Sequence, residues 1–138
     1  HDVLISAEAL DWAGVAVVKN AYRLYQERGY RTKLLVAAFR NQHHWEEFIG
    51  GDIVLTITSD WQRKYNGSDV EIKNNIDTPV ESKLMEELMK LDEFKKAYLE
   101  DGLKPEEFEH YGAFLATMNQ FLGGYDDLVR LIRSYMIK

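Results

Sequence analysis

Arg40 and Asn41 are the residues best suited to bind a charged group, and they follow an apolar run at residues 33–39 (KLLVAAF). Arginine carries a permanent, planar positive charge that fits a phosphate. In β/α barrels, the loops after the last strands and an adjoining helix N-terminus often hold a substrate phosphate. Asn41 can also cap the helix expected at residues 42–49. We therefore predict a phosphate site at Arg40 and Asn41; the alternative is a surface arginine paired with a nearby carboxylate.

A second kind of site is suggested by His43, His44, Glu46 and Glu47, because His43 and Glu47 lie four residues apart in the expected helix and could share a metal ion. Their spacing differs from the H-E-x-x-H pattern. A third ligand would have to come from elsewhere, for example from His110, and nothing in the sequence brings His110 close. We therefore expect no bound metal and a helix that faces solvent or a partner.

Covalent catalysis has no good candidate residue. The chain has no cysteine, and no serine stands in a G-x-S-x-G context. A lysine that forms a Schiff base needs a desolvated place inside a barrel. Lys33 opens a predicted strand at the wrong end, and Lys19 and Lys64 belong to helical or post-strand segments. We predict no catalytic residue within this chain.

Short apolar segments predict the strands that position Arg40. Residues 3–6 predict a first strand, and the helix that follows should end at Gly29 in the left-handed conformation. The run at residues 33–39 is typical of an interior parallel strand covered on both faces. Residues 52–58 (DIVLTIT) predict the next strand. The predicted fold is α/β, with two or three parallel strands and their helices.

Strand signals fade beyond residue 65, and the rest of the chain is predicted to be helical. Thr78 should cap a helix that has Pro79 as its first residue and Glu81 completing a capping box. Leu84, Leu88 and Leu91 should share one face of this helical segment. Further helices are expected from Asp92 to about Glu100 and from Pro105 to Tyr111. The chain is accordingly divided into β/α units at residues 1–65, a polar linker at residues 66–77 and a helical extension at residues 78–138.

The last stretch carries one long apolar stripe, because spacings of four and three alternate along its large side chains. Gly123 and Gly124 interrupt it. Two adjacent glycines cost about 2 kcal/mol relative to alanine in a helix interior, so we expect a kink or two helices there. The stripe supports an alternative function, a non-enzymatic module for docking or oligomerisation. Its residues are Phe114, Met118, Phe121, Tyr125, Leu128, Ile132 and Tyr135.

Composition excludes several classes of protein. The 138 residues carry a net charge of −6 without any long basic run, so a nucleic acid partner is not expected. No apolar stretch is long enough for a membrane span. The lack of cysteine favours a cytoplasmic location. The chain opens at His1 on an apolar, strand-like segment, which suggests the middle of a longer protein.

Three stretches together resemble the transaldolase family: residues 10–12 (LDW), residues 35–41 (LVAAFRN) and residues 51–57 (GDIVLTI). The middle stretch is the most specific, because it is similar to the family motif M-G-A-S-F-R-N on the seventh barrel strand. The resemblance implies a (β/α)8 TIM barrel of the class I aldolase type. It implies transfer of a dihydroxyacetone unit between sugar phosphates through a lysine Schiff base, without a metal or organic cofactor. Arg40 then matches the family's phosphate-binding arginine.

The chain also departs from the family pattern. Ala38 replaces a serine that also binds phosphate, and Glu8 stands where an arginine is usual. The Schiff-base lysine and its acidic neighbours belong to earlier strands that this sequence does not contain. We therefore expect a C-terminal segment of a transaldolase-like enzyme that is inactive alone. Its bare strands should drive self-association or packing on the missing N-terminal part of the barrel.

Overall fold

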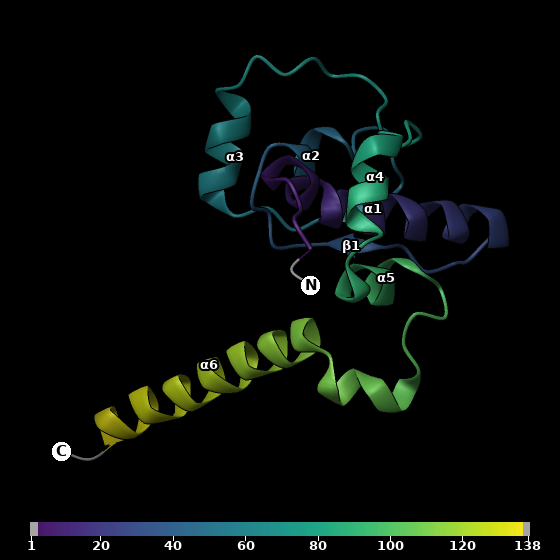
Figure 1. Ribbon diagram of the computed structural model, residues 1–138. Helices are drawn as coiled ribbons and strands as arrows, with labels where there is room; N and C mark the ends of the chain where they lie inside the picture. The colour runs from purple at the N-terminus through teal and green to yellow at the C-terminus, as the bar shows by residue number, and fades with distance from the viewer. Residues whose placement is uncertain (1–2, 137–138) are drawn as a thin grey trace. The chain divides into compact units, whose positions relative to one another are not determined.

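The computed structural model describes residues 3–136. Its contacts divide the chain into two compact units, separated between Glu100 and Asp101 (Figure 1). The segment from residue 78 to residue 100 therefore packs with the β/α part of the chain. The predicted division at residues 65 and 77 stays a prediction about domains, and each unit is described below by itself.

Helix α1 (Ala7–Arg28) is the longest element of the first unit, and local signals set both of its ends. Oγ of Ser6 accepts a hydrogen bond from the backbone N–H of Ala9 at 3.1 Å, which satisfies a free donor at the helix start. Gly29 ends the helix with a φ of 62°, the left-handed conformation that the sequence predicts. Val15, in the middle of the helix, is fully buried.

Residues 3–6 do not form the strand that the sequence suggests. The hydroxyl of Ser6 caps α1, and its backbone N–H donates to Oε2 of Glu87 at 2.9 Å. The same hydrogen bond lowers the pKa of the Glu87 carboxyl. A strand needs a partner for its backbone groups, whereas Ser6 makes its hydrogen bonds with helical residues. The prediction of a strand here was wrong.

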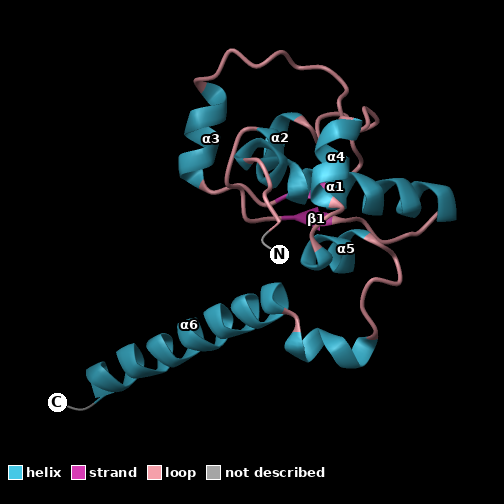
Figure 2. Cartoon of the chain, viewed as in Figure 1, coloured by secondary structure: helices cyan, strands magenta, loops and turns pink. Residues whose placement is uncertain are grey.

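Two strands form a parallel sheet, joined by a chain segment that contains the short helix α2 (His43–Glu46). Backbone hydrogen bonds of 2.9 Å join the two strand segments. Figure 2 shows the strands in magenta among the helices. The predicted parallel strand–helix–strand order is therefore present in the first unit. The strands are β1 (Leu35–Val36) and β2 (Val54–Leu55), with Leu35 opposite Val54 and Val36 opposite Leu55.

Both strands are shorter than predicted, and only one face of the sheet is covered. Val36 and Leu55 pack against the buried cluster around Val15 of α1. Leu35 and Val54, on the other face, are 64% and 47% exposed. A sheet of two strands with a bare face is marginal, so the pairing extends over only two residues in each strand. The prediction that residues 33–39 are interior is wrong for this chain.

Two hydrophobic clusters, both built on α1, hold the first unit together. One joins α1 to α4 (Ser82–Leu88) and α5 (Asp92–Tyr98), and it confirms Leu84 and Leu88 as members of one buried face. The other joins α1 to the region around the sheet. Helix α3 (Ser59–Asn66) follows β2 and buries Tyr65. The buried members are Ala9, Ala16, Leu84, Leu88 and Phe94 in the first cluster and Val15, Phe48 and Ile76 in the second.

Helix α4 begins at Ser82, four residues after the predicted cap at Thr78. The backbone N–H of Thr78 donates to the carbonyl of Asn75 at 3.0 Å, which makes a turn. Its carbonyl accepts a hydrogen bond from Nζ of Lys19 at 2.7 Å. That carbonyl would otherwise open the helix, so the contact with Lys19 keeps the segment extended through Pro79. The predicted capping box was wrong for this reason.

The second unit consists of a 3-10 helix, η1 (Pro105–His110), and the long helix α6 (Gly112–Met136). Helix η1 occupies the segment where a helix from Pro105 to Tyr111 was predicted. Helix α6 runs without interruption through Gly123 and Gly124, so the predicted kink is wrong. Helix extension is cooperative, and the good helix formers on either side offset the cost of two glycines. Within residues 3–136 no helix is long and apolar enough to cross a membrane.

Candidate functional site

The end of β1 turns sharply at Ala38, whose φ of 64° lies in the left-handed region. Side chains other than glycine rarely adopt this conformation, and such positions cluster at binding sites. The turn leads from the sheet to Phe39, which is buried, and to Arg40, which is exposed. The backbone at Ala38 therefore sets the direction in which the chain leaves the strand towards Arg40.

The guanidinium of Arg40 is available to an anion. Its Nη1 donates to the carbonyl of Phe39 at 3.0 Å, which directs the side chain. No carboxylate within residues 3–136 forms an ion pair with it, so the alternative of a paired surface arginine finds no support there. The backbone N–H of Arg40 is also held, because it donates to Nδ1 of His44 at 3.2 Å.

Asn41 fixes the loop that carries Arg40. Its Nδ2 donates to the carbonyl of Asp11 on α1 at 3.1 Å, and its Oδ1 accepts the backbone N–H of His44 at 3.2 Å. The second contact is the cap that the sequence predicts. Helix α2 is only a single turn where residues 42–49 were predicted to be helical, so its dipole adds little positive charge. Asn41 as a phosphate ligand stays a prediction, because both ends of its amide bind protein atoms here.

His44 lies beside Arg40 in its neutral form. Because its Nδ1 accepts the Arg40 N–H, a neutral ring carries its proton on Nε2. Burial lowers the pKa of His44, and the hydrogen bond and charge of Asp11 oppose that effect only in part. The sequence suggests His44 only as one of several possible metal ligands and does not predict its contact with Arg40. The signal that could have identified His44 is its position, four residues after the arginine at the strand end.

A cluster of aromatic side chains packs against the loop that carries Arg40. The ring of Tyr65 stacks on Trp45 with centroids 4.5 Å apart, lies 5.5 Å from Trp61 and meets the edge of Phe39 at 6.2 Å. Burial raises the pKa of the Tyr65 hydroxyl, which donates to the carbonyl of Asn41 at 3.5 Å. The cluster joins α3 to the end of β1 and so ties both strand ends to the position of Arg40.

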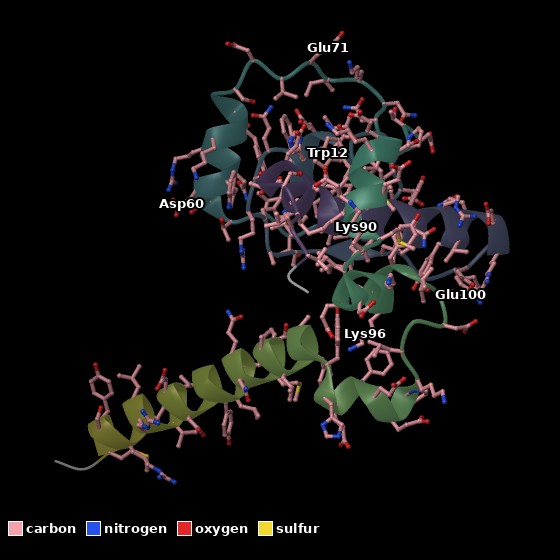
Figure 3. The ribbon with its side chains drawn as sticks, viewed as in Figure 1. Trp12, Asp60, Glu71, Lys90, Lys96 and Glu100 are labelled. Carbon is pink, nitrogen blue, oxygen red and sulfur yellow. The ribbon has the colours of Figure 1, made fainter. Side chains whose placement is uncertain are left out.

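The residues considered for a metal site have other partners. Nδ1 of His43 lies 2.8 Å from Oε1 of Glu46, and its ring stacks on that of Trp12 of α1 with centroids 4.6 Å apart. Trp12 is labelled in Figure 3. Glu47 pairs with Lys19. His110 lies in the second unit, 3.3 Å from Glu109. Over residues 3–136 no three potential ligands come together.

The lysines considered for Schiff-base chemistry also have partners. Nζ of Lys19 is buried and contacts Oε2 of Glu47 at 2.5 Å and two backbone carbonyls at 2.7 and 2.8 Å. Lys33 pairs with Asp52 near the start of the strands. Nζ of Lys64 lies 4.1 Å above the ring of Trp61. An amine nucleophile needs a free lone pair, and the ammonium of Lys19 uses its donors to hold the fold together.

Two parallel strands joined through a helix, with an exposed arginine after the first strand, define a protein of the α/β class. The chain matches the family described as Transaldolase/Fructose-6-phosphate aldolase over residues 3–116. It therefore belongs to this family, and the resemblance found in the sequence is confirmed. Most of α6 lies beyond the matched residues.

The curated relatives of the chain are transaldolases that are longer than it is. It is 30% identical over 98 residues to a transaldolase of Gloeobacter violaceus and 31% identical over 98 residues to one of Thermosynechococcus vestitus; each match covers 70% of this chain and 25% of the relative. A transaldolase of Wigglesworthia glossinidia brevipalpis is 35% identical over 83 residues, covering 59% of this chain and 26% of the relative. The chain thus spans about a quarter of the length of these relatives. No solved structure matches it.

Proposed function

We propose that this chain supplies the phosphate-binding part of a transaldolase-type active site, which transfers a dihydroxyacetone unit between sugar phosphates. The Schiff-base lysine of that reaction comes from a part of the barrel outside this sequence, so the chain alone is inactive. The reaction requires neither a metal nor an organic cofactor, and it takes place in the cytoplasm. Family membership supports the class of reaction, and the geometry at Arg40 supports the role of this chain.

The observation that carries the proposal is the exposed guanidinium of Arg40 at the end of β1. Its backbone and side chain are both directed by hydrogen bonds, to His44 and to Phe39. No carboxylate among the described residues neutralises its charge. An arginine held in this way loses little conformational entropy when it binds a phosphate. Its remaining N–H groups can contact two phosphate oxygens.

The uncovered face of the sheet supports the second half of the proposal. Leu35 and Val54 expose apolar side chains on the face opposite α1. In a closed barrel this face would point to the interior, where neighbouring strands would cover it. The partner we propose for it is the N-terminal part of a transaldolase barrel, which would bring the missing lysine to the same end of the strands as Arg40.

The phosphate site can be tested by NMR titration of the full chain with fructose 6-phosphate, in a buffer without phosphate. We expect backbone amides near Arg40 and His44 to shift. A charge-assisted hydrogen bond is worth roughly 1.5–3 kcal/mol, so Arg40→Ala should weaken binding about 10- to 100-fold. Inorganic phosphate should shift the same amides, because the proposed contact is with the phosphate group.

Arg31→Ala is the matched control. Arg31 is also exposed, but it precedes β1 and so lies at the opposite end of the strand. Its loss changes the net charge of the chain by the same amount and should leave binding unchanged. Equal losses in the two variants would mean that the anion is attracted only by overall charge, which contradicts the proposal. Shifts confined to amides away from Arg40 would contradict it too.

A further inference from the structure

Helix α6 presents a long apolar face that its own unit does not cover. None of its residues is buried, and the large apolar side chains on this face are between 40% and 77% exposed. Contiguous exposed apolar surface of this size marks an interaction site. The side chains are Phe114, Leu115, Met118, Phe121, Leu122, Tyr125, Leu128, Leu131, Ile132, Tyr135 and Met136.

The face has the pattern of a helix that packs on another helix. Alternating spacings of three and four place one row of side chains along its centre, from Phe114 to Tyr135, as at the a and d positions of a heptad repeat. Leu115, Leu122 and Val129 extend it along one side. The charged residues of this stretch, among them Asp126 and Arg130, fall outside these rows. The face is therefore neutral, and a second copy of it would meet no repelling charge.

We propose that α6 pairs with α6 of a second copy of this chain in antiparallel orientation. With the pair centred between residues 126 and 127, the central side chains interdigitate from Met118 to Tyr135. Antiparallel packing also places the two helix dipoles favourably. The central contacts are Tyr125 with Leu128 of the second copy, Phe121 with Ile132 of the second copy, and Met118 with Tyr135 of the second copy.

This alignment accounts for a glycine in the middle of a long helix. Gly124 borders the apolar face, and the pairing brings Leu131 of the second copy over it, so the missing side chain makes room for a large one. Within a single chain, a Cβ added at Gly123 or Gly124 would meet nothing within 4 Å. Neither glycine is therefore required by contacts inside the chain, although each costs about 1 kcal/mol in a helix.

The apolar area of α6 and the charges around it also favour a second copy of the chain over a membrane as the partner. Exposed side chains of this size offer roughly 60 Å² each, so two such faces bury more than the roughly 1,000 Å² that a specific interface needs. A helix that lies on a membrane is instead rich in lysine and arginine on its polar face. The described part of α6 has Asp126 and Asp127 against Arg130 and Arg133, which leaves it without net charge.

Sedimentation equilibrium of the full chain tests the pairing. We expect a dimer of twice the chain mass of 16.1 kDa at tens of micromolar. Phe121→Asp places a charge in the centre of the face and should weaken the dimer at least 100-fold. Gln120→Asp adds the same charge on the neighbouring polar position and should leave the dimer intact. The tryptophans all lie in the first unit, so their near-ultraviolet circular dichroism shows whether that unit stays folded in each variant.

The two glycines provide a second matched pair. Gly124→Leu should weaken the dimer at least tenfold, because it fills the space for Leu131 of the second copy. Gly123→Leu, one position away and outside the face, should leave the dimer as it is or strengthen it through better helix propensity. Contacts within one chain cannot separate these variants, since both positions are open in the monomer.

Orientation is tested by disulfide cross-linking, which the absence of native cysteine makes simple. In a mixture of Met118→Cys and Tyr135→Cys chains, the antiparallel pair should give mostly mixed cross-links. Met118→Cys alone should give few, because its two sulfurs would lie about 25 Å apart along the helices. Each of these results would overturn the proposal: a monomer, a larger assembly, equal effects within either matched pair, or efficient cross-linking of Met118→Cys with itself.

Discussion

Lys19 connects three parts of the first unit, and its replacement by methionine should be strongly destabilising. The side chains of Lys19 and Glu47 are 8% and 15% exposed. Nζ of Lys19 joins α1 to Glu47, after α2, and to the carbonyls of Asn75 and Thr78, before α4. Removing the ammonium leaves a largely buried carboxylate and two carbonyls without their donor. Breaking a buried ion pair from one side costs about 3–5 kcal/mol, and we expect Lys19→Met to lower the free energy of unfolding by this amount.

Urea unfolding followed by tryptophan fluorescence measures this loss, because Trp12, Trp45 and Trp61 all report on the first unit. A double variant, Lys19→Met with Glu47→Leu, removes both charges and should recover about 2 kcal/mol or more of the loss. If Lys19→Met does not fold, Glu47→Gln offers a milder test. It keeps an oxygen acceptor for Lys19 and should cost about 1 kcal/mol. The reasoning is refuted if Lys19→Met stays within 1 kcal/mol of the wild type, or if the double variant is no more stable than the single one.

Two further predictions concern the turn that carries Arg40. Ala38→Gly should raise the free energy of unfolding by about 0.5–1 kcal/mol, since the strain of a left-handed alanine outweighs the added chain entropy of glycine. Ala37→Gly changes the neighbouring residue, which has no positive φ, and should lower the free energy of unfolding. If the urea midpoints of both variants move in the same direction, the left-handed conformation of Ala38 is not a source of strain. Because burial lowers the pKa of His44 in the folded chain, the unfolded chain takes up the proton first, and stability should fall as the pH drops below about 6.5. His44→Asn keeps an acceptor for the Arg40 N–H and should flatten this part of the pH profile, so an unchanged profile would rule out His44 as its source.

Local signals in the sequence were sufficient for the elements that depend on neighbouring residues. The left-handed Gly29, the cap made by Asn41 and the buried face of Leu84 and Leu88 were all predicted correctly. Each depends on backbone geometry or on spacing within one helix, which the residue types determine. The order of the parallel strands followed from the apolar runs on either side of α2.

Predictions that depend on contacts between residues far apart in the sequence were wrong. Thr78 has the residues of a capping box, but Lys19, 59 residues away, binds the carbonyl that the helix start would use. Lys19 is not suited to catalysis by its place in a helix, and its role in the fold is structural. Its burial follows from the packing of α1 against segments at residues 75–78 and 47, and no spacing within the sequence indicates that contact.

The bare face of the sheet connects the fold to the proposed function. The run at residues 33–39 is apolar at nearly every position, so it has apolar side chains on both faces of the strand. Such a strand is favourable only when both of its faces are covered. In this chain α1 covers one face, while Leu35 and Val54 remain exposed on the other. Arg40 follows the carboxyl end of β1 in this sheet. Under the function that we propose, parallel barrel strands that cover the bare face would end beside Arg40, so the same segment would supply both the missing packing and the Schiff-base lysine.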